Sequence, residues 1–143
     1  MSYTYKYPRP SVTVDIIIFR REENDTKVLL IRRGQYPFEW RWAFPGGFLE
    51  MNEELEESAR RELKEETSLE VNELEQLQAF GKIGRDPRGR TISVVFYGFA
   101  DNENQKVKGG DDASRAQWFP VNEVPPLAFD HDEILQKALE KIK

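Results

Sequence analysis

The stretch that decides the fold is residues 46–69, which read GGFLEMNEELEESARRELKEETSL. Two glycines open it, and a run of carboxylates leads into a segment of helical character. Residues three and four apart are neighbours on a helix, so Glu62 faces both Glu65 and Glu66. Like charges placed in this way destabilise an isolated helix by roughly 0.2–0.5 kcal/mol per pair. A bound Mg²⁺ would offset the repulsion, because hard cations take carboxylate oxygens, waters and substrate phosphates as ligands.

The spacing of these residues is more specific than their charge. From Gly47 to Leu69 the pattern is G-x5-E-x7-R-E-L-x-E-E-x-S-L. This pattern resembles the Nudix box, which has an apolar residue in place of each leucine and a glycine in place of the serine. Ser68 is the one departure. The family's glycine ends the helix in a left-handed conformation at little steric cost, and serine is less favourable there. The departure removes none of the carboxylates.

The resemblance to Nudix hydrolases implies a fold and a reaction. The fold is α/β: an α-β-α sandwich with a mixed sheet, the acidic box helix and a C-terminal helix. The reaction is hydrolysis of a nucleoside diphosphate linked to another moiety, with Mg²⁺ or Mn²⁺ as cofactor. A cation in such a site would neutralise phosphoryl oxygens and lower the pKa of a bound water. One competing interpretation is a solvated acidic helix face. Another is an acidic helix that serves as a protein-binding surface, which predicts no response to divalent cations.

The match to the box also implies roles for single residues. Those that would bind the metal are the carboxylates of Glu62, Glu65 and Glu66 and the backbone carbonyl of Gly46. Glu53 would support the site, and Arg61 would hold an acid in place. The general base stays open between Glu62 and an acid on a distant loop, Asp112, because the choice depends on geometry in the substrate complex. An ordinary turn or cap role is the alternative for Asp112.

Three further segments resemble the ADP-ribose pyrophosphatase branch of the family. They are residues 86–90 (DPRGR), 110–113 (GDDA) and 127–131 (LAFDH). This resemblance implies ADP-ribose or a similar nucleoside diphosphate sugar as substrate, with AMP and a sugar phosphate as products. A nucleoside triphosphate pyrophosphatase and a non-catalytic ADP-ribose sensor are the alternatives. Such sensors carry a fused winged-helix domain, for which 143 residues leave no room, so we expect catalysis.

Four side chains are candidates for contact with the substrate. An arginine fork binds phosphate oxygens in a bidentate way, which favours Arg88 first and Arg32 second. Aromatic faces stack on bases, so Trp42 and Phe129 are candidates for an adenine, although core packing is the usual role of such residues. The only histidine, His131, is expected at the surface where the last helix begins.

Composition limits the class of protein. With 143 residues and 38% apolar content, we expect a single domain over residues 1–143. The net charge of −5 is concentrated: residues 50–75 carry −8 and the rest of the chain +3. A nucleic-acid binder would have a basic stripe, so we expect a small-molecule nucleotide as partner and no nucleic acid.

No cysteine, signal-peptide core or membrane-length apolar stretch occurs in the sequence. These features favour a cytoplasmic protein without a membrane partner. A homodimer is one candidate assembly, in which Tyr3, Tyr5 and Tyr7 would form a strand against a partner subunit.

The rest of the sequence alternates strands and loops. Apolar and β-branched runs predict strands at residues 12–19, 27–33, 74–83, 91–100 and 116–119. The box helix is expected to begin near Glu53 with Asn52 as its N-cap. The last helix is expected to begin at Asp130, whose side chain would cap it together with Glu133.

Overall fold

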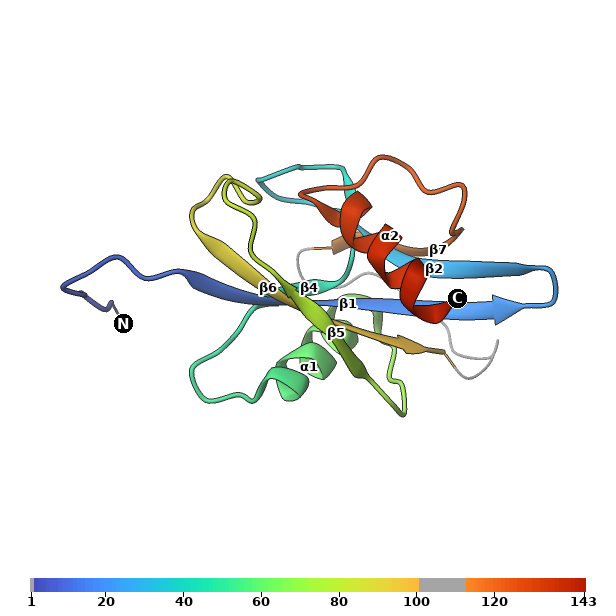
Figure 1. The fold of residues 1–143 in the computed structure, drawn as a ribbon, viewed down its shortest axis with the longest axis horizontal. Coiled ribbons are helices and arrows are strands. Elements are labelled where there is room, and N and C mark those ends of the chain that lie inside the picture. Colours follow the sequence, from blue (N-terminus) through green and yellow to red (C-terminus); the bar gives the residue numbers. More distant parts are fainter. Residues whose placement is uncertain (1, 101–112) are drawn as a thin grey trace.

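In the computed structural model, which describes residues 2–100 and 113–143, a mixed sheet lies between two helices (Figure 1). The helices are α1 (Leu55–Thr67) and α2 (His131–Ile142). The strands are β1 (Ser11–Glu22), β2 (Asp25–Arg33), β3 (Trp42–Ala43), β4 (Gly46–Phe48), β5 (Glu75–Phe80), β6 (Thr91–Phe99) and β7 (Ala113–Pro120). The α/β sandwich expected from the sequence is confirmed.

The strand order of the sheet is β3-β2-β1-β6-β5, with β4 added to β1 and β7 to β2. Strands β1 and β6 are parallel, and the other pairs are antiparallel. Strands β1 and β2 pair only near their connecting turn, over residues 19–22 and 25–28, and then part. In the space between them, β4 pairs with residues 13–15 of β1 and β3 with residues 31–32 of β2. This parting of two central strands creates the place where the candidate site lies.

The alternation of side chains along β1 divides the core between the two helices, because successive residues of a strand point to opposite faces. Ile17 and Phe19 belong to the cluster on the α2 side. Ile16 and Ile18 belong to the cluster on the α1 side. The helices contribute their own apolar stripes to these clusters, which are Ala59 and Leu63 from α1 and Ile134, Leu135 and Ala138 from α2.

Both ends of α1 differ from a simple helix. The helix begins at Leu55 with Glu54 as N-cap, so the prediction of Asn52 is wrong by two residues. The Glu54 amide donates to the Glu57 carboxylate at 2.9 Å, which satisfies a donor that the first turn leaves unpaired. At the other end Ser68 has φ +67° and its amide donates to the Lys64 carbonyl. Serine therefore adopts the left-handed conformation that the family's glycine normally supplies.

The start of α2 also departs from expectation. Asp130 is the N-cap residue, but its side chain does not cap the helix. Its carboxylate instead accepts hydrogen bonds from Arg85 Nε at 3.0 Å and Nη2 at 2.8 Å. The next residue, His131, is only 2% exposed, so the prediction of a surface histidine is wrong.

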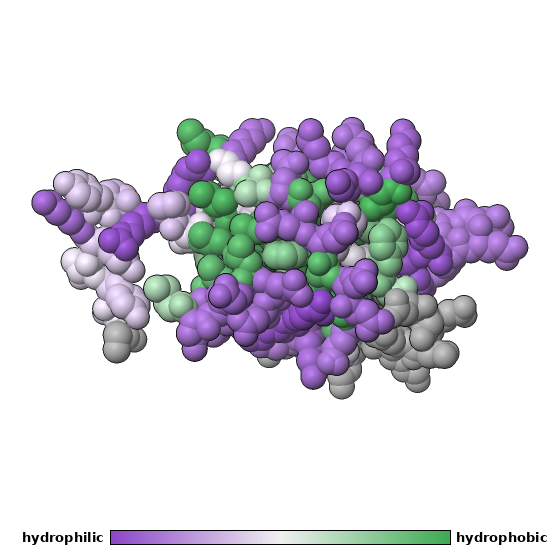
Figure 2. Space-filling model, turned by 60° about the horizontal axis from the view of Figure 1, so that its bottom comes forward, coloured by the Kyte–Doolittle hydropathy of each residue, from purple (hydrophilic) through white to green (hydrophobic). Residues whose placement is uncertain are grey.

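The N-terminal residues 2–10 project from one end of the body, and they contain no strand (Figures 1 and 2). The side chains of Tyr3, Tyr5 and Tyr7 are exposed. The predicted strand would form against a partner subunit, so both that strand and the homodimer stay predictions. Within the part of the chain that the structure describes, neither helix combines the length and the apolar character needed to cross a membrane.

Candidate active site

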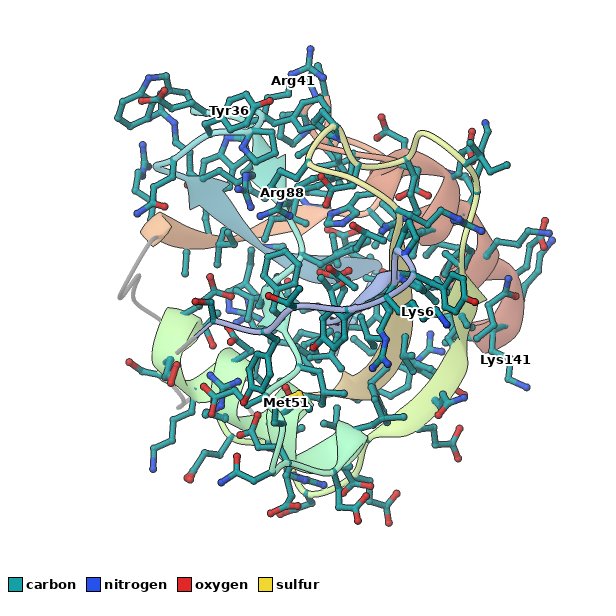
Figure 3. The ribbon with its side chains drawn as sticks, turned by 90° about the vertical axis from the view of Figure 1, so that its left-hand side faces the viewer. Lys6, Tyr36, Arg41, Met51, Arg88 and Lys141 are labelled. Atoms are coloured by element: carbon teal, nitrogen blue, oxygen red, sulfur yellow. The ribbon has the colours of Figure 1, made fainter. Side chains whose placement is uncertain are left out.

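A cleft of about 780 Å³ opens where β1 and β2 part. Acidic side chains reach it from α1, and basic side chains reach it from β2 and from the loop between β5 and β6. The charged or hydrogen-bonding side chains in its walls include Asp15, Arg33, Glu62, Glu65, Glu66, Arg85, Asp86, Arg88 and His131. In Figure 3 Arg88 lies near the middle of the view, with Tyr36 above it and Met51 below. The helix with the box acids and the loop with Arg88 therefore meet at one cavity.

The acidic wall follows from helix geometry, since residues three and four apart share a face. Glu62, Glu65 and Glu66 all line the cleft. The side chain of Glu62 is 14% exposed and that of Glu65 40%. Strand β4 packs closely against this face, and a Cβ atom on Gly47 would lie 2.6 Å from the nearest Glu62 oxygen. The first glycine of the box is therefore needed for the close approach of strand and helix.

Arg61 organises the acids from beside the cleft. Its Nε and Nη2 donate to the two oxygens of Glu53 at 2.6 and 3.0 Å. Its Nη1 donates to Glu62 at 2.8 Å and to Glu65 at 3.1 Å. The hydrogen bonds from Arg61 lower the pKa of Glu53. The guanidinium thus holds two cleft acids, with Glu53 fixing its orientation from the far side.

Glu66 is the most buried acid of the wall, at 7% exposure. Burial raises its pKa to about 8, and the charges of Glu62 and Asp15 act in the same direction. The Gly46 amide opposes this by donating to Glu66 Oε1 at 2.7 Å. Burial raises the pKa of Glu62 as well, against the effect of Arg61. Burial in this wall therefore disfavours the charged forms of Glu66 and Glu62 as long as no further cation lies beside them.

A divalent cation fits this wall by donor type, since Mg²⁺ and Mn²⁺ prefer carboxylate and carbonyl oxygens. Within residues 2–100 and 113–143, no group of three acidic or histidine side chains converges closely enough to hold an ion. Glu62 and Glu65 are both bonded to Arg61 instead. The carboxylates of α1 supply the correct oxygen donors along one wall. The distance between Glu62 and Glu65 is set by Arg61, which bonds to both.

The basic side of the cleft is built around Arg88. Its guanidinium forms a two-point contact with Asp86, with Nε at 3.1 Å and Nη2 at 2.8 Å from the carboxylate oxygens. Burial would raise the pKa of Asp86, but the hydrogen bonds from Arg88 outweigh it and lower that pKa. The guanidinium also lies over the rings of Phe48 and Phe129, 4.7 and 5.6 Å from their centroids. Arg88 is thus held in place at the cleft before any ligand arrives.

A second guanidinium approaches the same aromatic ring. Arg33 lies 5.1 Å from the Phe129 centroid, and its Nε donates to the Pro37 carbonyl at 2.6 Å. Burial lowers the pKa of Arg33, and the charge of Arg88 lowers it further. Phe129 itself has φ +54°, a left-handed conformation that is uncommon outside glycine and occurs at ligand sites. The two guanidinium groups near this ring repel each other, and a bound anion would offset that repulsion. This part of the cleft therefore favours a negatively charged ligand.

Comparison with known proteins decides the family. A model of the NUDIX domain matches residues 9–138. The chain belongs to the Nudix hydrolase family. Members of this family hydrolyse pyrophosphate bonds, and the acidic wall on α1 is the Nudix box predicted from the sequence.

Two Nudix relatives and one solved structure show which branch this chain is similar to. An ADP-ribose pyrophosphatase of Methanocaldococcus jannaschii is 45% identical over 130 residues, which cover 91% of this chain and 73% of the relative. The ADPR-responsive transcriptional repressor NtrR of Acinetobacter baylyi is 34% identical over 142 residues, or 95% of this chain. The match spans only 56% of that repressor. The NUDIX domain of Shewanella oneidensis NrtR, solved with ADP ribose, has a TM-score of 0.88 at 32% identity, covering 99% of this chain and 94% of that one.

The structure does not bring every predicted Nudix site residue to the cleft. Arg32 and Trp42 are not among the residues that line it. The guanidinium of Arg32 lies over Trp40, at 5.2 Å, and its Nε donates to the Trp40 carbonyl at 3.3 Å. Trp42 packs edge-on against Phe119 in the core cluster on the α2 side. Asp112 lies outside the described residues, so its role stays a prediction.

Several cleft residues were missed by sequence reasoning. The clearest is Asp15, which is 8% exposed and accepts a short hydrogen bond from the Ser93 hydroxyl. A signal for it was present, because Asp15 is the one charged residue within the apolar run 12–19. No local feature of the sequence indicated that Arg85 and His131 line the cleft, or that Arg33 lines it and Arg32 does not.

Proposed function

We propose that this protein hydrolyses the diphosphate bond of ADP-ribose or a similar nucleoside diphosphate sugar, releasing AMP and a sugar phosphate. The observation that carries the proposal is that the box acids of α1 line one cleft together with Arg88 and Phe129. The 45% identity to an archaeal ADP-ribose pyrophosphatase supports this choice of substrate. The cleft volume of about 780 Å³ also lies within the range for small-molecule sites, which is roughly 300–1,000 Å³.

The acidic wall would hold Mg²⁺ or Mn²⁺ through Glu62, Glu65, Glu66 and the Gly46 carbonyl. When bound, a divalent cation supplies charge neutralisation for phosphoryl oxygens and a more acidic water. Arg61 would hold Glu62 and Glu65 close to each other and oriented, since its Nη1 donates to both. Glu53 would not bind the metal itself; it would fix the orientation of Arg61, which donates to both of its oxygens.

The arginine pair would receive the negative charge of the substrate. Arg88 is oriented by Asp86, and Arg33 by the Pro37 carbonyl, so neither guanidinium must be ordered at the moment of binding. Phe129 lies beside both and offers a face for a planar group. We propose Arg33, rather than Arg32, as the second phosphate-binding arginine, because Arg33 lines the cleft.

The proton acceptor stays open between Glu62 and Asp112. Glu62 is at the cleft, and burial raises its pKa toward the range in which a base works near neutral pH. Separate substitutions Glu62→Gln and Asp112→Asn would distinguish them. The residue whose substitution removes the acidic limb of the kcat/KM profile is the base.

The experiment that tests the function is a substrate panel with product identification. ADP-ribose, other nucleoside diphosphate sugars and nucleoside triphosphates are incubated with the protein and Mg²⁺. The proposal predicts AMP and ribose 5-phosphate from ADP-ribose. Release of inorganic pyrophosphate from triphosphates, with ADP-ribose untouched, would instead identify a nucleoside triphosphate pyrophosphatase.

A second candidate function is binding of ADP-ribose without turnover. It is favoured by the 34% identity to an ADPR-responsive repressor and by the fold match to a NUDIX domain solved with ADP ribose. The intact box acids on the cleft wall favour hydrolysis over sensing. Saturable ADP-ribose binding with no product at any Mg²⁺ or Mn²⁺ concentration would reverse this order.

A further inference from the structure

The single histidine of the chain is enclosed beneath the cleft, at the first position of α2. His131 stacks on Phe44 with ring centroids 4.6 Å apart and an interplanar angle of 21°. The Phe44 amide donates to His131 Nδ1 at 3.1 Å. An imidazole nitrogen accepts a hydrogen bond only when it carries no proton, so the proton of the neutral ring is on Nε2. Burial lowers the pKa of His131, which favours this neutral form.

His131 is itself held firmly. The preceding residue, Asp130, forms the two-point contact with Arg85, whose side chain is 3% exposed. The His131 amide donates to the Ala128 carbonyl at 3.1 Å. On the other side of the ring, Nε2 lies 3.9 Å from Asp15 Oδ2, which is too long for a hydrogen bond. The fixed contact of the ring is therefore the one through Nδ1.

The segment that His131 contacts leads directly to the acidic wall. Two residues after Phe44, the Gly46 amide donates to Glu66 Oε1 at 2.7 Å. Between them, the Pro45 carbonyl accepts from the Ile16 amide at 2.9 Å. Gly46 also lies so close to Asp15 and to the Val14 carbonyl that no Cβ atom fits. Residues 44–46 thus form a hydrogen bond with a side chain of α2, at His131, and with a side chain of α1, at Glu66, and Phe44 also packs in the core cluster on the α2 side.

We propose that His131 is a positioning residue, which places the Gly46 backbone and hence the Glu66 carboxylate by accepting the hydrogen bond of the Phe44 amide. Its relevance to metal binding rests on the proposed function, in which Gly46 and Glu66 belong to the metal site. Loss of the acceptor leaves a buried amide unpaired, which is unfavourable and lets the segment move. Mutation of residues that orient metal ligands in this way typically weakens metal binding by roughly 10–100-fold.

The wild-type protein gives the first test, because a single histidine makes the ¹⁵N imidazole signals unambiguous. We expect an unprotonated Nδ1, a protonated Nε2 and a scalar coupling across the hydrogen bond between the Phe44 amide and Nδ1. A protonated Nδ1 at neutral pH would overturn the proposal, since a donor cannot accept from an amide. This measurement requires no metal, no substrate and no variant.

Three variants give the second test. His131→Asn places an amide oxygen close to the position of Nδ1, His131→Gln places it further along the side chain, and His131→Phe keeps the stacking ring without an acceptor. Ile134→Val is the matched control, because it removes one buried methyl group from the core cluster that α2 shares with Phe44 but leaves the Nδ1 acceptor of His131 in place.

The readouts are amide hydrogen exchange of Gly46 in the metal-free protein and Mn²⁺ affinity by electron paramagnetic resonance. For His131→Gln and His131→Phe we expect at least 10-fold faster Gly46 exchange and about 10-fold weaker Mn²⁺ binding, whereas His131→Asn should be close to wild type. If His131→Gln and His131→Phe match Ile134→Val in both readouts, His131 only fills space and the proposal is wrong. If a variant does not fold, the wild-type imidazole measurement decides alone. Neither readout depends on ADP-ribose, so failure of the proposed substrate leaves this test intact.

Discussion

Arg61 and Glu53 form a two-point ion pair, with Nε 2.6 Å from one carboxylate oxygen and Nη2 3.0 Å from the other. The eight-residue separation of the pair is part of the Nudix box, so the box encodes the orientation of an arginine as well as metal ligands. The remaining nitrogen of that arginine, Nη1, contacts Glu62 and Glu65. The spacing of the acidic wall therefore depends on a residue outside the cleft.

Substitution of Arg61 tests this dependence. Arg61→Gln should weaken Mn²⁺ binding roughly 10–100-fold, because Glu62 and Glu65 lose their common partner. Arg60→Gln is the matched control: Arg60 is on the same helix, but it contacts Glu56 and the carbonyls of Val71 and Asn72. Titration of Mn²⁺ by electron paramagnetic resonance measures both. Equal affinities for the two variants would show that Arg61 does not organise the wall.

The raised pKa of Glu66 gives a pH dependence with a definite sign. Its pKa is about 8 in the folded protein against an ordinary value of 4.5, so between these values the folded state keeps a proton that the unfolded state releases. The stability of the metal-free protein should therefore fall as pH rises from about 5 to about 8. In Glu66→Gln this contribution is absent, and the variant should gain roughly 3–4 kcal/mol relative to wild type between pH 5 and pH 8. Urea unfolding in EDTA at both pH values measures the difference, and a gain independent of pH contradicts the assignment.

Ser68 offers a test of backbone strain at the end of α1. Its φ of +67° is unfavourable for any residue with a Cβ atom. Ser68→Gly should stabilise the protein by up to about 1 kcal/mol, since strain relief exceeds the added flexibility of the unfolded chain. Ser68→Ala keeps the Cβ atom and should give no gain. Urea unfolding of both variants checks this, and a glycine variant less stable than wild type would contradict it.

The ion pair between Arg85 and Asp130 is buried, with side chains 3% and 11% exposed. Removing one partner leaves the other charge unpaired, which costs about 3–5 kcal/mol for buried pairs. Arg85→Gln should therefore lower the free energy of unfolding far more than Lys82→Gln, because Lys82 and its partner Glu133 are 71% and 67% exposed. Thermal unfolding of the two variants compares them. Equal losses would mean that the Arg85 contact does not stabilise the fold.

The sequence was sufficient for features that depend on local spacing. The box helix, its acidic face and the apolar stripe of Ala59 and Leu63 follow from helical periodicity, and the structure has all three. Its start was misplaced because Asn52 is the better N-cap by residue type. The observed Glu54 start depends on the amide contact with Glu57.

Features that depend on distant partners could not be predicted. Asp130 was expected to cap α2, but its carboxylate is taken by Arg85, which lies 45 residues away in sequence. The choice between Arg32 and Arg33 depends on the register near the end of β2, where the pairing with β7 shifts between these two residues. A period-two pattern gives no warning of such a shift. The burial of His131 likewise depends on the packing of α2 against residues 44–46.

The most direct test of the central claim is hydrolysis of ADP-ribose with Mg²⁺ by wild type and by the double variant Glu65→Gln plus Glu66→Gln. A matched control is Glu70→Gln plus Glu73→Gln, which removes two exposed acids outside the cleft. We predict that wild type and control release AMP and ribose 5-phosphate at similar rates, and that the cleft variant loses at least 100-fold in kcat/KM while remaining folded. Equal hydrolysis by all three proteins would contradict the assignment of the acidic wall as the metal site.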